Sequence, residues 1–145
     1  MTQQNVLFLC TGNSARSQMA EAFLRKYAGD RFGVYSAGLD PKGINPYTIH
    51  VMDEIGIDIR AQTSDPIKTY MGRMNFRYVI TVCTNADANC PTPLWHLGEK
   101  LHWPFADPAA ATGSDDEILA KFREVRDQIE VQIKAWVNML DTVEA

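Results

Sequence analysis

Short apolar runs alternate with longer amphipathic stretches along the chain. The run 6–9 is continuous and opens into a turn sequence, which is typical of a buried strand. Two more strands are predicted at 33–37 and at 78–82, and the latter is rich in β-branched residues. A weaker apolar run predicts a fourth strand at 100–103.

Helical periodicity separates these runs. It predicts helices over 17–27 and over 46–55, where a proline occupies the first turn, and a short helix over 64–71. The last helix has the clearest pattern, because Ser114 and Glu117 have the spacing of a capping box. Its apolar positions recur at steps of three and four and form one stripe. They are Ile118, Phe122, Val125, Ile129, Ile133, Trp136 and Leu140.

This alternation predicts an α/β fold, in which an open parallel four-stranded sheet carries helices on both faces. The length of 145 residues fits one domain, 1–145. In such sheets, ligands bind beyond the carboxyl ends of the strands. Cys10 follows the first strand and Cys83 ends the third, so both are expected at that edge.

The net charge and the composition limit the classes of binding partner and the cellular compartment that we expect. The formal net charge of −4 argues against nucleic acid or an anionic membrane. No stretch approaches the roughly 20 apolar residues of a membrane span, and the first residues do not resemble a signal peptide. A cytoplasmic protein is therefore expected. It has three cysteines, a low and odd number that does not suggest a disulfide scaffold.

The segment Cys10–Ser17 joins the first strand to the first helix. Its backbone N–H groups can form a nest around a tetrahedral anion, and the helix N-terminus points its positive end there. Arg16 offers a planar fork for two anion oxygens, and Gly12 can take conformations closed to other residues. The acidic protein is thus predicted to bind an oxyanion locally. The candidate oxyanion-binding residues are Thr11, Gly12, Asn13, Ser14, Ala15, Arg16 and Ser17.

Cys10 is the candidate nucleophile. A helix N-terminus or a neighbouring arginine lowers the pKa of a thiol from about 8.5 to roughly 3.5–7.5. We therefore expect a thiolate at neutral pH, with Thr11 and Ser17 offering hydroxyls to the sulfur. Asp107 is the candidate acid for the leaving oxygen, since Pro108 biases it toward an extended conformation. Most Asp-Pro pairs, however, are only turns.

Cys83 and Cys90 allow two interpretations. The three histidines form no paired motif, so a tetrahedral zinc site is poorly supported. Both cysteines can be buried structural thiols. Alternatively they form a redox couple, in which Cys83 attacks Cys10 and Cys90 then attacks Cys83.

Segments spread over nearly the whole chain carry a resemblance to a known family. They are 10–22, 34–38, 43–46, 57–59, 63–65, 83–91 and 103–108. Together they resemble the thioredoxin-coupled arsenate reductases, which share the fold of the low-molecular-weight tyrosine phosphatases. Ala15 stands where some members have a further cysteine, and the match is weak over 92–100.

The resemblance implies a function in arsenic detoxification. Cys10 would attack arsenate while Asp107 protonates the departing oxygen. Cys83 would then attack Cys10 and release arsenite, and Cys90 would attack Cys83. Thioredoxin would reduce the resulting Cys83–Cys90 disulfide, with no metal or flavin required. Phosphate and sulfate are expected to compete with arsenate.

Some members of this family also bind a potassium ion near the loop. The matching positions are Asn13, Glu21, Ser36 and Asp65. Their oxygen-bearing side chains suit a hard cation. Glu21 and Asp65 fit equally well as a surface charge or a helix cap.

Two alternatives stay open. A low-molecular-weight tyrosine phosphatase would use Cys10, Arg16 and Asp107, but those phosphatases resemble one another in an aromatic residue where this chain has Ala109, and they do not need a thiol relay. A non-enzymatic oxyanion-binding or redox-sensing module would need the loop alone. The reductant, thioredoxin or a low-molecular-weight thiol, stays open as well.

Overall fold

A parallel sheet of four strands forms the centre of the protein in the computed structural model, which describes residues 4–89 and 98–144. The strands are β1 (Gln4–Cys10), β2 (Phe32–Gly38), β3 (Tyr78–Thr81) and β4 (Glu99–His102). Their order in the sheet is β2-β1-β3-β4, so β1 has a neighbour on each side. Every residue from Val6 to Cys10 is buried, as the continuous apolar run predicted.

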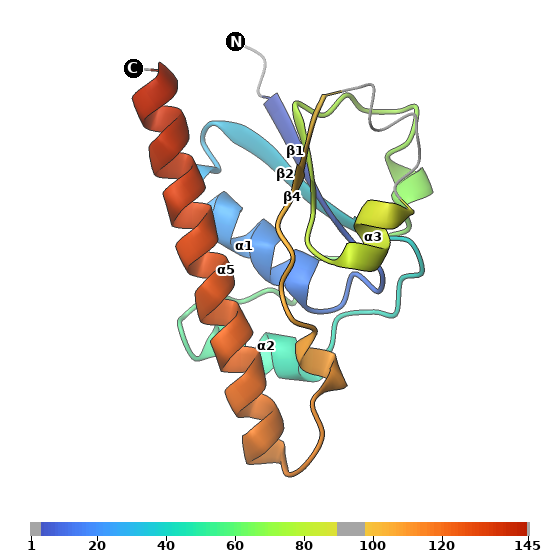
Figure 1. The fold of residues 1–145 in the computed structure, drawn as a ribbon, viewed down its shortest axis with the longest axis vertical. Helices are drawn as coiled ribbons and strands as arrows, with labels where there is room; N and C mark the ends of the chain where they lie inside the picture. The colour runs from blue at the N-terminus through green and yellow to red at the C-terminus, as the bar shows by residue number, and fades with distance from the viewer. Residues whose placement is uncertain (1–3, 90–97, 145) are drawn as a thin grey trace.

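Helices cover both faces of the sheet, which confirms the predicted fold class. They are α1 (Arg16–Ala28), α2 (Pro46–Asp53), α3 (Thr84–Ala88) and α5 (Asp115–Glu144), with 3-10 turns η1 (Ile67–Thr69) and η2 (Pro108–Ala110). Figure 1 shows α1 and α5 on one side of the strands and α3 on the other. The helix α5 packs along α1 and α2.

The last helix follows its sequence pattern closely. Its capping box forms, since the Glu117 N–H donates to the Ser114 hydroxyl at 3.2 Å. The predicted stripe is buried from Phe122 to Leu140, and Ile118 is partly buried. Within the described ranges, no helix combines the length and the apolar character needed to span a membrane.

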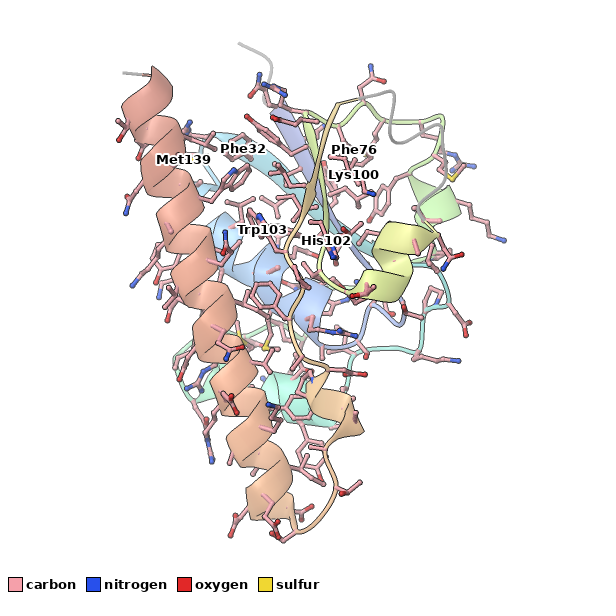
Figure 2. The ribbon with its side chains drawn as sticks, in the orientation of Figure 1. Phe32, Phe76, Lys100, His102, Trp103 and Met139 are labelled. Carbon is pink, nitrogen blue, oxygen red and sulfur yellow. The ribbon has the colours of Figure 1, made fainter. Side chains whose placement is uncertain are left out.

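Aromatic side chains fill the core on both sides of the sheet. On the α5 side, the Trp136 ring lies 5.9 Å from Phe32 and 5.4 Å from Trp103, centroid to centroid. On the other side, Tyr35 and Phe76 lie 6.1 Å apart. Figure 2 shows Phe32 and Trp103 toward α5 and Phe76 across the strands from them. Because both faces are covered, a ligand reaches this sheet at the edge where its strands end.

The strand register brings three carboxyl ends to that edge. Leu9 of β1 pairs with Ala37 of β2 and with Thr81 of β3. Cys10 follows Leu9 directly, and Cys83 comes just after Thr81. Both cysteines therefore lie at the same edge, as predicted.

Two local predictions need correction. The helix expected over 64–71 is only the short turn η1, because Pro66 keeps an extended backbone and pairs with Gly38 as a parallel bridge. In addition, Cys83 leads into the helix α3, which the sequence pattern did not predict.

Candidate active site

The loop between β1 and α1 is fastened to the segment that follows β2. Three backbone N–H groups of that segment donate to loop carbonyls: Leu39 to Cys10 (3.1 Å), Asp40 to Thr11 (2.8 Å) and Lys42 to Gly12 (2.9 Å). The Ser14 carbonyl accepts from the Asn45 N–H at 3.0 Å and from the Thr48 hydroxyl at 3.0 Å. With its carbonyls held outward, the loop has its N–H groups available for the concave side.

Asn13 holds the shape of this loop. It is fully buried, and its backbone φ of 48° is left-handed, a conformation that asparagine tolerates better than most residues. Its side-chain amide donates to the hydroxyls of Ser17 at 2.8 Å and Ser36 at 3.0 Å, and its carbonyl oxygen accepts from the Asp65 N–H at 2.9 Å. The conformational freedom that Gly12 offers is thus not used, since the left-handed residue of the loop is Asn13.

Cys10 lies at the start of the loop and is buried, with 3% of the residue exposed. The Asn13 N–H donates to its sulfur at 3.1 Å, and the Ser17 hydroxyl lies 2.8 Å away. Because the Ser17 oxygen already accepts from Asn13, its own hydrogen is left for the sulfur. Ser17 thus contacts Cys10 as expected.

Burial nevertheless raises the pKa of the Cys10 thiol above its usual value. Hydrogen bonds from Ser17 and Asn13 lower it by less, and the nearby Cys83 raises it further. The predicted lowering of this pKa is therefore wrong here, because desolvation of the sulfur outweighs its donors.

A pocket of about 230 Å³ opens above Cys10. Arg16 lines it, donating to the Phe105 carbonyl at 3.1 Å, and its Nη2 lies 3.8 Å from Asp107 Oδ2. Asp107 is extended, as Pro108 predicted, and its other oxygen accepts from the Ala109 N–H at 3.0 Å. The pocket thus brings the candidate nucleophile, cation and acid together.

Lys42 also lines this pocket, and sequence reasoning did not single it out. Its ammonium lies 2.8 Å from the Asp40 carboxylate, and both side chains are largely exposed. The available signal was its place just after β2, the strand next to β1.

Cys83 lies on the other side of the loop. Its buried sulfur is 3.5 Å from the Thr11 hydroxyl and accepts from the Ala86 N–H at 3.4 Å in the short helix α3. Thr11 was expected to bond the sulfur of Cys10, and the structure places its hydroxyl beside the second thiol. Cys10 and Cys83 are both free. Cys90 lies outside the described residues.

The four residues considered for a cation lie together beside the loop. The Ser36 hydroxyl accepts from the Asn13 amide at 3.0 Å and donates to Glu21 at 2.5 Å, while Arg25 donates to the other Glu21 oxygen at 2.6 Å. Burial raises the pKa of Glu21, hydrogen bonds from Ser36 and Arg25 lower it, and the charge of Asp65 raises it. Asparagine, serine and carboxylate oxygens are the ligands that suit a hard cation, although Arg25 already pairs with Glu21. Across 4–89 and 98–144, no three His, Cys, Asp or Glu side chains cluster as metal ligands.

The sequence matches a known family along almost its whole length. Residues 5–144 match the model of the low molecular weight phosphotyrosine protein phosphatases. The chain is 48% identical over 139 residues to an arsenate reductase of Halalkalibacterium halodurans, covering 95% of this chain and 98% of the relative. It is 45% identical over 138 residues to an arsenate reductase of Bacillus subtilis, with the same coverage of 95% and 98%.

Solved structures agree with this match. An arsenate reductase in the phosphate binding state is similar with a TM-score of 0.79 and 32% identity, over 94% of this chain and 98% of that one. An arginine phosphatase with a phosphorylated active-site serine reaches a TM-score of 0.77, over 95% of this chain and 96% of that one. At 19% identity, this second likeness shows the fold alone.

Proposed function

The chain belongs to the low molecular weight phosphotyrosine protein phosphatase family, and we propose that it acts within this family as an arsenate reductase with Cys10 as its nucleophile. Relatives named arsenate reductase match it nearly end to end. The observation that carries the proposal is the placement of two free, buried thiols, Cys10 and Cys83, against one candidate anion loop. Phosphoryl transfer uses one thiol, whereas reduction of arsenic(V) by two electrons uses two.

The first step joins arsenate to the protein. The loop N–H groups and Arg16 hold the arsenate oxygens, in the manner of an anion nest closed by a planar fork. The sulfur of Cys10 forms a bond to arsenic while one As–O bond breaks. The thiol proton leaves with that oxygen as water, and Asp107, at the pocket rim, passes it on. Ser17 and Asn13 stabilise the sulfur's charge during the attack.

The second step reduces arsenic. The sulfur of Cys83 attacks the sulfur of Cys10, so an S–S bond forms and the S–As bond breaks. The electron pair of the broken bond stays on arsenic, which leaves as arsenite. Two thiols have then lost two electrons and arsenic(V) has gained them.

The third step restores Cys10. Cys90 attacks Cys83, which frees Cys10 and leaves a Cys83–Cys90 disulfide for an external dithiol such as thioredoxin. A cycle that begins with three free thiols suits a reducing compartment, and we therefore place the protein in the cytoplasm.

A potassium ion is the cofactor that best fits this chain, bound by Asn13, Glu21, Ser36 and Asp65. Its support is the meeting of these oxygen-bearing residues beside the loop, where Asn13, Ser36 and Glu21 are buried and joined by hydrogen bonds. When bound, the ion would supply positive charge that favours ionised Glu21. Comparing thermal unfolding in potassium and sodium chloride tests this. Wild type should be more stable in potassium chloride, and Glu21→Gln should remove the difference.

The competing function is a low-molecular-weight tyrosine phosphatase, which the same three pocket groups would serve. One feature favours it: Cys10, Arg16 and Asp107 all line one pocket. Ala109, however, gives that wall no aromatic side chain to stack against a phenyl ring.

The deciding experiment follows NADPH consumption on adding arsenate to the protein with thioredoxin and thioredoxin reductase. We expect arsenate-dependent turnover in wild type and its loss in both Cys83→Ser and Cys90→Ser. Turnover that survives in either variant would contradict the relay. Hydrolysis of an aryl phosphate through Cys10, without arsenate turnover, would establish the phosphatase instead.

A further inference from the structure

We propose that Lys42 is the second cation of the pocket, which captures the oxyanion at the mouth and passes it to Arg16 and Cys10. The inference rests on the proposed function, since it assigns a further binding residue to the same anion site. It adds a determinant of substrate affinity that no sequence motif indicated.

The placement of Lys42 is set by the loop itself. Its N–H donates to the Gly12 carbonyl at 2.9 Å, so its backbone is fastened directly to the anion loop. Its side chain crosses the loop, because its Cγ would lie 3.4 Å from a Cβ placed on Gly12. The lysine lines the same pocket as Cys10 and Arg16. A large residue at Gly12 would push this stem away.

The charges of the pocket show why a second cation is useful. The protein carries a net charge of −4, so its overall field repels an incoming anion. Arg16 is 14% exposed and already engaged with Phe105 and Asp107. Asp107 adds a carboxylate to the same pocket. Lys42 supplies the accessible positive charge, with 66% of its side chain exposed.

Lys42 can exchange its present ion-pair partner, Asp40, for a bound oxyanion. Its ammonium lies 2.8 Å from the carboxylate of Asp40, which is 69% exposed. Ion pairs between two exposed side chains contribute little, and a lysine stem rotates freely. An oxyanion in the pocket brings more negative charge than one carboxylate, so the ammonium can leave Asp40 for it. Asp40 is then the competitor that keeps Lys42 at the rim when no anion is bound.

The test compares Lys42→Met with Lys134→Met, which removes the same charge from α5, a helix that contributes no lining residue to this pocket. In the thioredoxin-coupled assay we expect Lys42→Met to raise the KM for arsenate and the Ki for phosphate by roughly 5- to 20-fold, the loss of one charge-assisted contact. Its kcat should stay within about two-fold of wild type.

Three further measurements separate binding from a structural role. Lys42→Arg should restore most of the affinity, Asp40→Asn should lower the KM, and Lys42→Met should flatten the dependence of kcat/KM on ionic strength. A KM for Lys42→Met equal to that of Lys134→Met would overturn the proposal. So would a loss confined to kcat.

A direct binding measurement keeps this inference distinct from the proposed function. Calorimetry with phosphate on Cys10→Ser protein, with and without Lys42→Met, needs no arsenate chemistry. If wild type fails to reduce arsenate but phosphate binding still weakens in the double variant, the function is wrong and the role of Lys42 stands. If arsenate is reduced and phosphate binds both proteins equally, the role of Lys42 is wrong.

Discussion

The two described thiols are held very differently. Cys10 receives an N–H at 3.1 Å and faces a hydroxyl at 2.8 Å, within a loop fastened to the neighbouring segment by several backbone bonds. Cys83 has contacts of 3.5 and 3.4 Å and leads into α3, a helix of five residues. A nucleophile benefits from fixed geometry, whereas a thiol that must reach its neighbour's sulfur needs freedom to approach. The tight and the loose site therefore suit the first and the second step.

Replacing each thiol should give the largest effects and separate the two sites. Cys10→Ser should lower arsenate turnover by about 10³-fold or more, since the nucleophile is lost. Cys83→Ser should also stop turnover but still form the arsenic adduct on Cys10. Mass spectrometry of the intact protein after arsenate addition distinguishes the two variants. Absence of the adduct in both variants would contradict the separate roles proposed for Cys10 and Cys83.

Asn13→Ala should be the next most damaging change. It removes bonds to Ser17, Ser36 and the Asp65 backbone and leaves a left-handed φ on alanine. We expect a loss of roughly 2–4 kcal/mol in the free energy of unfolding and a fall in kcat of about 10- to 100-fold. Urea unfolding and initial rates measure both. Thr48→Val, which removes one outer loop bond, is the milder control.

Ser17→Ala tests the donor to the nucleophile through pH. The Ser17 hydrogen bond lowers the pKa of Cys10 against the rise caused by burial. Removing it favours the neutral thiol, so the rise of reactivity with pH should move to higher pH. Alkylation of Cys10 by iodoacetamide at pH 7 should slow by roughly 3- to 10-fold. Cys83→Ser and Cys90→Ser together, in both proteins, confine the alkylation signal to Cys10. A profile that moves to lower pH would contradict the role of Ser17.

Thr11→Val should have the smallest effect. It keeps the shape of the side chain but removes the long hydroxyl contact with Cys83. We expect single-turnover arsenite release to change by less than about three-fold. A change as large as that of Ser17→Ala would show that Cys83 is held as firmly as Cys10, and the comparison would fail.

Much of the fold follows from the sequence because its signals are local. The run 6–9 is apolar throughout because both faces of the central strand β1 are covered. The stripe from Phe122 to Leu140 identifies α5, and the Ser114 cap marks its start. The helix predicted over 64–71 is shortened to the turn η1, because a bridge between Pro66 and Gly38 takes the place of its first turn.

The sequence predicted that Cys10, Arg16 and Asp107 would lie together, and they line one pocket, but the details of that pocket depend on contacts between distant segments. The left-handed residue is Asn13 and not Gly12, because bonds to the distant Ser36 and Asp65 hold it there. The pKa of Cys10 is raised because its sulfur is buried, and this burial depends on the packing of the folded chain, which the local motif does not show. Lys42 reaches the pocket through pairing between the ends of β1 and β2, which no local motif records.

The side-chain amide of Asn13 sets the direction of the hydrogen bonds in the site. The Asn13 nitrogen donates to Ser36 on one side and to Ser17 on the other, so both hydroxyls point their own hydrogens away from it. One hydrogen goes to Glu21 and the other faces the sulfur of Cys10. The carboxyl of Glu21 and the sulfur of Cys10 are thus the two accepting ends of a single oriented chain of hydrogen bonds. Protonating Glu21 would weaken its hydrogen bond with Ser36. The buried carboxyl and the nucleophile are therefore coupled through the chain of hydrogen bonds, although they do not contact each other.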